Sequence, residues 1–244
     1  MTNFVVLQSG GPTPVINRSL TGIIRKAKEL FPNNQVFGAR HGVEGLITDE
    51  LVDLTALGES DLDIIDQTPG AVLGSTRHKI TLEELPIILD TLDKNRIDIL
   101  HIIGGNDSAE TGVDIQKYAS RLDHELQVIN VPKTIDNDLV ETDHCPGFGS
   151  TAKFIALATL GIGMDTKSMG KYAPVAIMEV MGRDTGWLAA ASGLLKRSQD
   201  EPPHFIGIPE QNIDEKHFID VIHNSLTSYG YAVAVVAENS TTDT

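Results

Sequence analysis

The chain has 244 residues, of which 41% are hydrophobic and 5% aromatic, enough for one substantial core or two smaller ones. Its formal net charge of −15 at pH 7 disfavours nucleic acid and anionic membrane surfaces as partners. Cys145 is the only cysteine, so an intrachain disulfide is excluded. No apolar run approaches the roughly 20 residues of a membrane span, and we expect a cytoplasmic protein.

Short apolar runs alternate with helical patterns along the chain, which predicts α/β architecture with mostly parallel sheets. Several runs are unbroken and β-branched, as in strands buried on both faces. The predicted strands are residues 4–7, 35–38, 99–103, 127–131, 175–180, 205–208 and 233–237. The predicted helices are residues 15–30, 82–94, 108–122, 151–163, 185–196 and 215–228. A boundary in the loop 145–149 gives two domains, 1–147 and 148–244.

The first candidate site loop, residues 9–14, lies between the first strand and the first helix. Gly10 and Gly11 allow a tight turn and a close approach to a ligand. Thr13 suits a helix N-cap, with Pro14 at the first helical position. The amides of a helix N-terminus bind anions, although an ordinary strand-to-helix turn would have the same composition.

A second loop, residues 73–77, ends in Arg77, whose guanidinium is suited to phosphate oxygens. The alternative is a surface arginine, but His78 and Lys79 add further positive charge in an acidic protein.

A third loop, residues 104–108, reads Gly-Gly-Asn-Asp-Ser at the carboxyl end of an apolar strand, where open α/β sheets bind ligands. Capping of the next helix by Asp107 or Ser108 is the alternative role.

Residues 131–138, Val-Pro-Lys-Thr-Ile-Asp-Asn-Asp, form the most distinctive stretch. They place Lys133, Thr134, Asp136 and Asp138 directly after an apolar strand. Phosphoryl transfer needs a base for the attacking hydroxyl and a cation for the phosphate. In an extended loop the two aspartates would point the same way, one as base and the other orienting a metal or a neighbour. A surface turn accounts for Asp-Asn-Asp alone but poorly for the whole string.

Two weaker candidates follow later strands. Met181, Gly182 and Arg183 come after the apolar run 175–180, where the arginine is suited to a second anionic substrate. Glu238 follows the last predicted strand and is suited to sugar hydroxyls. For Arg183 and Glu238 alike, a solvated strand end is the alternative.

In order and approximate spacing, these loops resemble those of the phosphofructokinase family from the first strand to Glu238, and residues 132–138 are highly specific to it. The resemblance implies two three-layer α/β/α domains, the first binding the phosphate donor and the second the sugar phosphate. Family members continue well beyond Glu238, so we expect a C-terminal part to be missing.

The resemblance also implies a role for each motif. Asp136 is expected to act as the base toward the C1 hydroxyl of fructose 6-phosphate, with Thr134 and Asp138 beside that hydroxyl and the donor phosphate. The residues expected to bind donor phosphate are Gly10, Gly11, Arg77 and Gly105. Those expected in catalysis are Lys133, Asp107 and Asp136. Those expected at the acceptor are Thr134, Ile135, Asp136, Asp138, Met181, Gly182, Arg183 and Glu238.

Two positions bear on the donor. ATP-using members usually carry glycine at the positions of Lys133 and Asp107, whereas pyrophosphate-using members typically carry lysine and aspartate. Asp107 would repel the α-phosphate region of a nucleotide, and Lys133 would neutralise a leaving phosphate. Pyrophosphate is therefore the expected donor. An ATP-dependent enzyme and a non-catalytic binding module of the same fold are the alternatives, and a related acceptor such as sedoheptulose 7-phosphate stays open.

Asn106 stands where most family members use an aspartate near magnesium. Its amide can bond a metal-bound water but adds no charge, so Mg²⁺ is expected to be held indirectly, with help from Asp107 or the pyrophosphate itself. The family is oligomeric, which implies a homodimer or homotetramer.

Overall fold

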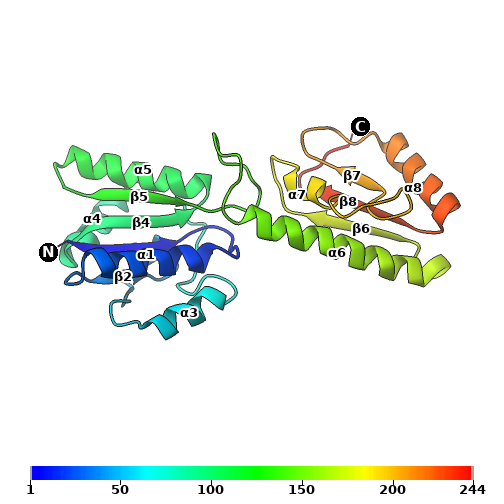
Figure 1. Ribbon diagram of the computed structural model, residues 1–244. Coiled ribbons are helices and arrows are strands. Elements are labelled where there is room, and N and C mark those ends of the chain that lie inside the picture. Colours follow the sequence, from blue (N-terminus) through cyan, green and yellow to red (C-terminus); the bar gives the residue numbers. More distant parts are fainter. Residues whose placement is uncertain (1, 243–244) are drawn as a thin grey trace. The chain divides into compact units, whose positions relative to one another are not determined.

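The computed structural model describes residues 2–242 and divides into two compact units, Met1–Thr134 and Ile135–Thr244 (Figure 1). Each unit is a parallel or mostly parallel sheet covered by helices, which confirms the predicted α/β class. The division falls earlier than the boundary expected after Gly147, because Ile135 already packs against the core of the second unit. The assignment of donor to the first part and acceptor to the second stays a prediction.

The first unit contains a five-stranded sheet with the order β3-β2-β1-β4-β5. All neighbours in it are parallel except β2 and β3, which are antiparallel. The strands are β1 (Asn3–Gln8), β2 (Val36–Ala39), β3 (Leu51–Asp53), β4 (Ile97–Gly104) and β5 (Gln127–Pro132). This order puts β1 and β4 in the middle, where their runs of Val, Ile and Leu are buried on both faces.

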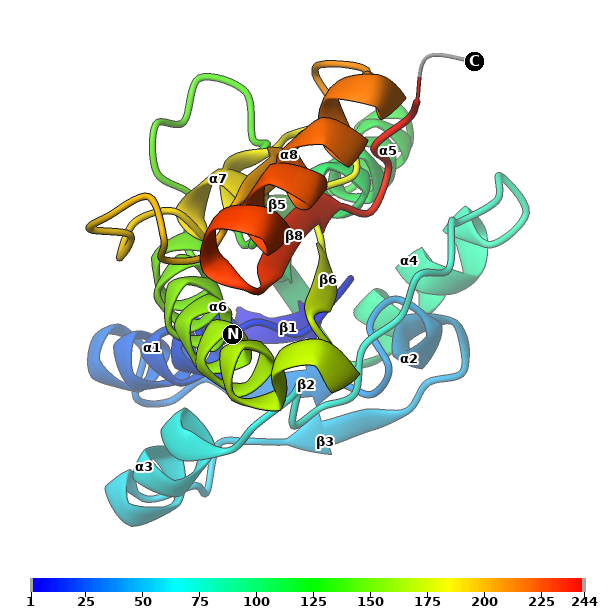
Figure 2. The same cartoon turned by 90° about the vertical axis from the view of Figure 1, so that its right-hand side faces the viewer.

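Helices cover both faces of this sheet (Figure 2). On one face α1 and α3 pack against Phe4 and Val6, and on the other α2, α4 and α5 pack against Val5 and Leu7. Side chains alternate between the faces along β1, so one strand contributes to two separate cores. The helices are α1 (Ile16–Leu30), α2 (Glu44–Ile47), α3 (Glu59–Gln67), α4 (Leu85–Lys94) and α5 (Asn106–Arg121).

The second unit has a parallel three-stranded sheet with the order β6-β8-β7. Its core cluster places α6 and α7 against Val235 and Ala237 of the central strand. On the opposite face α8 packs Phe218 edge-on against Phe205, with ring centroids 4.9 Å apart. The elements are α6 (Phe148–Met169), the 3-10 helix η1 (Gly170–Tyr172), β6 (Val175–Val180), α7 (Trp187–Ala191), β7 (Phe205–Gly207), α8 (Glu215–Tyr229) and β8 (Ala232–Ala237).

Every predicted strand and helix is present, with shifted ends in most cases. The prediction for α6 was too short, and that for α7 too long, since α7 ends at Ala191 and continues only as a turn. Four elements were not predicted: α2, β3, α3 and the 3-10 helix η1. Of these, α2 and β3 are only four and three residues long, and α3 buries only Leu62 fully, so its apolar pattern is weak.

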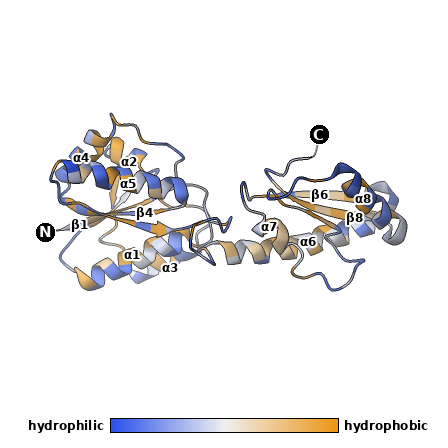
Figure 3. Cartoon of the chain, turned by 90° about the horizontal axis from the view of Figure 1, so that it is seen from above, coloured by the Kyte–Doolittle hydropathy of each residue, from blue (hydrophilic) through white to orange (hydrophobic). Residues whose placement is uncertain are grey.

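The strands are strongly hydrophobic in both units; α5 and α8 are largely hydrophilic, whereas α6 and α7 are not (Figure 3). Among residues 2–242, none of the helices combines the length and the apolar character needed to cross a bilayer.

Candidate active site

In the first unit, the candidate loops meet at the carboxyl ends of parallel strands. The N–H of Gly10 donates to the carbonyl of Thr76 at 2.9 Å, and the N–H of Lys133 donates to the carbonyl of Gly104 at 3.0 Å. The segments joined in this way are residues 9–14, 73–77, 104–108 and 133. The structure thus brings together three loops and a lysine that are far apart in the sequence, at the edge where open α/β sheets bind ligands.

Lys133 lies at the centre of this group. Its side chain is buried, with the residue only 4% exposed, and its Nζ donates to the carbonyl oxygen of Gly11 at 2.9 Å. A Cβ on Gly10 would lie 3.1 Å from Nζ, and Gly10 has φ +77°, so glycine serves both the turn and the close approach of the cation. The result is a buried positive charge against a glycine turn, an arrangement suited to an anion.

Asn106 and Asp107 form the first turn of α5, after Gly105 as the N-cap residue. Both are exposed. Asp107 Oδ1 lies 3.6 Å from Nζ of Lys79, with the two side chains 73% and 76% exposed. Such an exposed pair contributes little to stability, so the Asp107 carboxylate stays accessible to a ligand. Arg77 is also exposed, directly after Thr76.

The predicted cap of α1 is wrong. The helix begins at Ile16, after Val15 in helical conformation, and no side chain caps it. Thr13 is buried, and its Oγ1 has no hydrogen-bond partner within the described chain. Pro14 and Val15 form a turn ahead of the helix, so the loop runs further than the Thr-Pro pair indicated.

The alternative role for Asp107 and Ser108, capping of α5, is also wrong, because the helix begins before them at Asn106. Ser108 Oγ instead donates to Ser9 Oγ at 2.8 Å, which ties the third loop to the first. Two isolated serines in sequence carry no signal for such a contact.

In the second unit, Asp136 and Asp138 flank a sharp change in the backbone. Both are half-buried, and Asn137 between them has φ 59° in the left-handed region. The loop is therefore not extended, and the expectation that the two carboxylates point the same way no longer follows from alternation. Asn137 is buried, and its amide bonds the carbonyl of Asp143 at 3.2 Å and the N–H of Cys145 at 2.8 Å. This asparagine fixes the loop from inside, a role not foreseen from the sequence.

Two predicted acceptor residues lie between Lys133 and Asp136, and their side chains are not exposed enough to contact a substrate. Thr134 is 9% exposed at the end of the first unit. Ile135 is half-buried and packs against the core of the second.

The loop after β6 carries the other predicted acceptor residues. Met181 is 52% exposed and Arg183 is also exposed, so both side chains are accessible. Gly182 is buried, and its N–H donates to Glu238 Oε1 at 3.4 Å. The structure thereby joins two motifs that the family resemblance assigns to the same acceptor, at the edge where the parallel strands β6 and β8 end.

Thr185 belongs to the same loop and was not foreseen. Its Oγ1 donates to the backbone carbonyl of Asp136 at 2.6 Å. A lone threonine before a helix gives no indication of a contact with a residue so distant in the sequence.

The donor set for a divalent cation is sparse. Across residues 2–242, no three side chains of the His, Cys, Asp and Glu types gather as a metal site. Magnesium usually keeps several waters and takes one or two carboxylates together with substrate phosphates. Asn106 and Asp107, adjacent and exposed at the start of α5, fit that kind of partial site.

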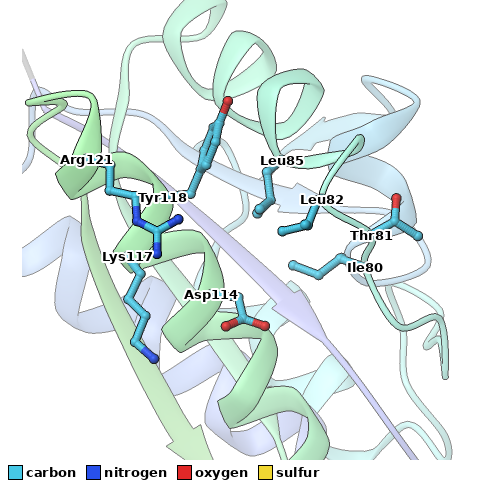
Figure 4. Close-up of a pocket in the computed structure, with 8 residues that line it drawn as sticks. All are labelled: Ile80, Thr81, Leu82, Leu85, Asp114, Lys117, Tyr118 and Arg121. Carbon is cyan, nitrogen blue, oxygen red and sulfur yellow. The ribbon is translucent and has the colours of Figure 1, made fainter.

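A pocket of about 340 Å³ lies elsewhere on the first unit, between the segment before α4 and the outer part of α5 (Figure 4). Tyr118 and Arg121 line one side, and Leu82 and Leu85 face them from the other. None of the predicted site residues lines it, so this pocket is separate from the glycine loops around Lys133.

Comparison with known proteins is in agreement with these motifs. The family model for phosphofructokinase matches residues 3–244. The pyrophosphate--fructose 6-phosphate 1-phosphotransferase of Rhodospirillum rubrum is 40% identical over 235 residues, which cover 96% of this chain and 57% of that protein. The sulfofructose kinase of Alkalicoccus urumqiensis is 35% identical over 237 residues, covering 96% and 60%.

The crystal structure of a pyrophosphate-dependent phosphofructokinase from Marinobacter aquaeolei superimposes with a TM-score of 0.91 at 38% identity. The match covers 99% of this chain and 62% of that one. The chain thus spans roughly three fifths of the length of these relatives. Since the family match takes in nearly every residue, including all the loops described above, the chain belongs to the phosphofructokinase family.

Proposed function

We propose that the protein transfers a phosphoryl group from pyrophosphate to the C1 hydroxyl of fructose 6-phosphate, giving fructose 1,6-bisphosphate and phosphate. The observation that carries this proposal is the buried Lys133, which donates to the carbonyl of Gly11 in the first loop. The similarity to the pyrophosphate-dependent relatives from Rhodospirillum and Marinobacter supports the same donor.

Lys133 is suited to the leaving group. When the bond between the bridging oxygen and the transferred phosphorus breaks, the leaving phosphate gains negative charge, and a fixed cation stabilises it. A lysine ammonium is a compact point charge, which suits inorganic phosphate oxygens. A Cβ at Gly11 would meet no atom within 4 Å, so an anion can approach the backbone of the loop there.

Asp107 is suited to excluding nucleotides. Its exposed carboxylate lies in the first turn of α5, next to Gly105. Pyrophosphate ends at its second phosphorus, whereas a nucleoside triphosphate continues into an α-phosphate and a nucleoside. A negative charge near the position of the α-phosphate would weaken the binding of the nucleotide and leave the binding of pyrophosphate unaffected.

Asp136 is the proposed base. It accepts the proton of the C1 hydroxyl as that oxygen forms its bond to the transferred phosphorus, and no protein nucleophile is needed. Asp136 follows Lys133 by three positions in the sequence.

Magnesium would be bound by the pyrophosphate oxygens, with Asn106 and Asp107 as the nearest protein donors of the first unit. Bound there, it would neutralise donor charge. We further infer a cytoplasmic location, which a single cysteine suits, and a homodimer or homotetramer, which the family resemblance implies.

The test is a coupled assay of fructose 1,6-bisphosphate formation by the protein in its full natural length, with Mg²⁺ and either pyrophosphate or ATP. We expect turnover with pyrophosphate at least 100-fold above that with ATP. Efficient turnover with ATP alone would falsify the donor assignment.

A second acceptor is favoured by one observation, the 35% identity to a relative named sulfofructose kinase. Arg183 is exposed after β6 and can pair with a sulfonate as well as with a phosphate. Measuring phosphate release from pyrophosphate with either sulfofructose or fructose 6-phosphate separates the two, since the preferred acceptor has the higher kcat/KM.

A further inference from the structure

The hydroxyl of Thr185 is bonded directly to the backbone of the proposed base. Its Oγ1 donates to the carbonyl oxygen of Asp136 at 2.6 Å, within the second unit and in a partly buried setting. Asp136 and Thr185 are 49 positions apart, so this is a tertiary contact and not a local turn. The Asp136 carbonyl belongs to the peptide that leads into Asn137, the residue with φ 59°.

The loop that carries Thr185 is itself held at several points. The N–H of Gly182 donates to Glu238 Oε1 at 3.4 Å, and the N–H of Gly186 donates to Glu210 Oε1 at 2.8 Å. Gly182 has φ +126°, and a Cβ there would lie 2.4 Å from the carbonyl oxygen of Thr185. Thr185 thus lies in a tight turn that two glutamates fix, one on either side of it.

The other side of the Asp136 peptide is fixed as well. The Asn137 side chain bonds the N–H of Cys145 and the carbonyl of Asp143. Rotation of the peptide between Asp136 and Asn137 would break the Thr185 bond or displace the Asn137 amide. The Thr185 hydroxyl and the Asn137 side chain therefore hold the backbone at Asp136 from its two sides.

We propose that Thr185 is a positioning residue that aligns Asp136 with the acceptor loop 181–183. This inference rests on the proposed function, in which Asp136 takes the proton of the C1 hydroxyl. Thr185 does not touch the substrate in this role. It sets the distance between the base and the loop that holds the sugar, and an error of about 1 Å in such a distance can cost roughly 100-fold in rate.

The test compares Thr185→Val, which keeps the shape and removes the hydroxyl, with Thr185→Ser, which keeps the hydroxyl. In the protein of full natural length, we expect Thr185→Val to lower kcat by about 10- to 100-fold. We expect Thr185→Ser to stay within about threefold of the unchanged protein, because the bond to Asp136 can still form.

Measurements of sugar binding distinguish the positioning role from a merely structural one. Calorimetry with fructose 6-phosphate should give an unchanged stoichiometry and a Kd within about threefold for Thr185→Val, because alignment affects the chemical step more than ground-state binding. Thr227→Val is the matched control, since Thr227 Oγ1 also donates to a backbone carbonyl, that of His223, at 2.9 Å on exposed α8. The control should leave kcat unchanged.

The possible outcomes differ in what they overturn. A full kcat in Thr185→Val overturns the inference, and so does a loss of kcat in proportion to lost sugar binding or to fewer binding sites. If the unchanged protein itself transfers no phosphoryl group from pyrophosphate, the proposed function fails first. Loss of kcat with binding intact, restored by serine, supports the positioning role.

Discussion

In the first unit a five-stranded sheet lies between helices on both faces, whereas the second has three strands and one small buried cluster. The second unit also exposes large apolar side chains on or after its helices: Phe154 is 67%, Met164 74% and Leu194 69% exposed. An apolar hollow of about 630 Å³ lies between α6 and α7, lined by Phe148 and Trp187 among others.

The difference extends to the candidate sites. The predicted donor-side loops of the first unit are held by main-chain bonds at strand ends together with side-chain bonds of Lys133 and Ser108. On the acceptor side, side-chain bonds from Thr185, Asn137 and Glu238 hold the loops. A site built on rigid strand ends tolerates side-chain changes better than one held by a few side-chain hydrogen bonds, so we expect single substitutions to misalign the second more easily.

The largest effect is expected for Asp136→Asn. Asparagine keeps the shape but cannot accept the proton of the acceptor hydroxyl, so kcat should fall by about 100- to 10,000-fold while the Kd of pyrophosphate changes less than about tenfold. Asp143→Asn, an exposed acid in the same loop, is the control and should retain activity. Comparable rates in the Asp136 variant would refute its role as base.

A somewhat smaller effect is expected on the donor side. Lys133→Met removes the buried cation and should lower kcat/KM for pyrophosphate by about 100- to 1,000-fold. Lys117→Met, an exposed lysine on α5, should not. Equal losses in the two variants would show that general charge, and not the contact of Lys133 with Gly11, is responsible.

Replacing both Asp107 and Lys133 by glycine tests donor choice. We expect the ratio of kcat/KM for ATP to that for pyrophosphate to rise at least tenfold, since the repulsive carboxylate and the phosphate-binding cation are both removed. An unchanged ratio would mean that donor preference is set elsewhere. Each single change should move the ratio less than the pair.

The two cores can be compared through matched truncations. Leu100→Ala in the first unit and Leu188→Ala in the second remove the same atoms from positions at most 1% exposed, and each should cost about 2–5 kcal/mol. Trp187 is the only tryptophan and lies in α7, so its fluorescence reports the second unit alone. Leu188→Ala should lower the midpoint of the unfolding transition followed by fluorescence, and Leu100→Ala should not. Circular dichroism should detect the destabilisation in both variants. Equal shifts of the fluorescence midpoint would mean that the units unfold together.

The smallest effect is expected from pH. Burial lowers the pKa of His101 in β4, and burial with the nearby Lys196 lowers the pKa of His204, both from the usual 6.5. The folded state therefore favours the neutral rings, whereas the unfolded chain takes up protons below about pH 6.5. The free energy of unfolding should fall as pH decreases from 6.5 through the folded pKa values. His101→Leu should flatten this dependence in the first unit, and an unchanged slope would contradict the assignment.

Most of the helices and strands could be predicted from the sequence because they depend on local patterns of residues. The runs of β1, β4 and β8 are continuous and apolar, as buried parallel strands require, and the glycine loops follow such strands directly. Because β1 and β4 are parallel neighbours, the loops that follow them lie at the same edge of the sheet.

The remainder depends on contacts that no local pattern encodes. The bond from Thr185 to Asp136, the link between Ser108 and Ser9 and the inward side chain of Asn137 all join residues through the fold. The left-handed turn at Asn137 also invalidated an argument based on alternation, because one φ value redirects the chain.

The most direct test of the central claim is a competition in one sample, with the protein in its full natural length, Mg²⁺, fructose 6-phosphate and equal concentrations of pyrophosphate and ATP. Phosphorus NMR follows every donor and product at once. We predict that the pyrophosphate signal falls as phosphate and fructose 1,6-bisphosphate appear, with ATP unchanged. Accumulation of ADP while pyrophosphate persists would contradict the roles given to Lys133 and Asp107.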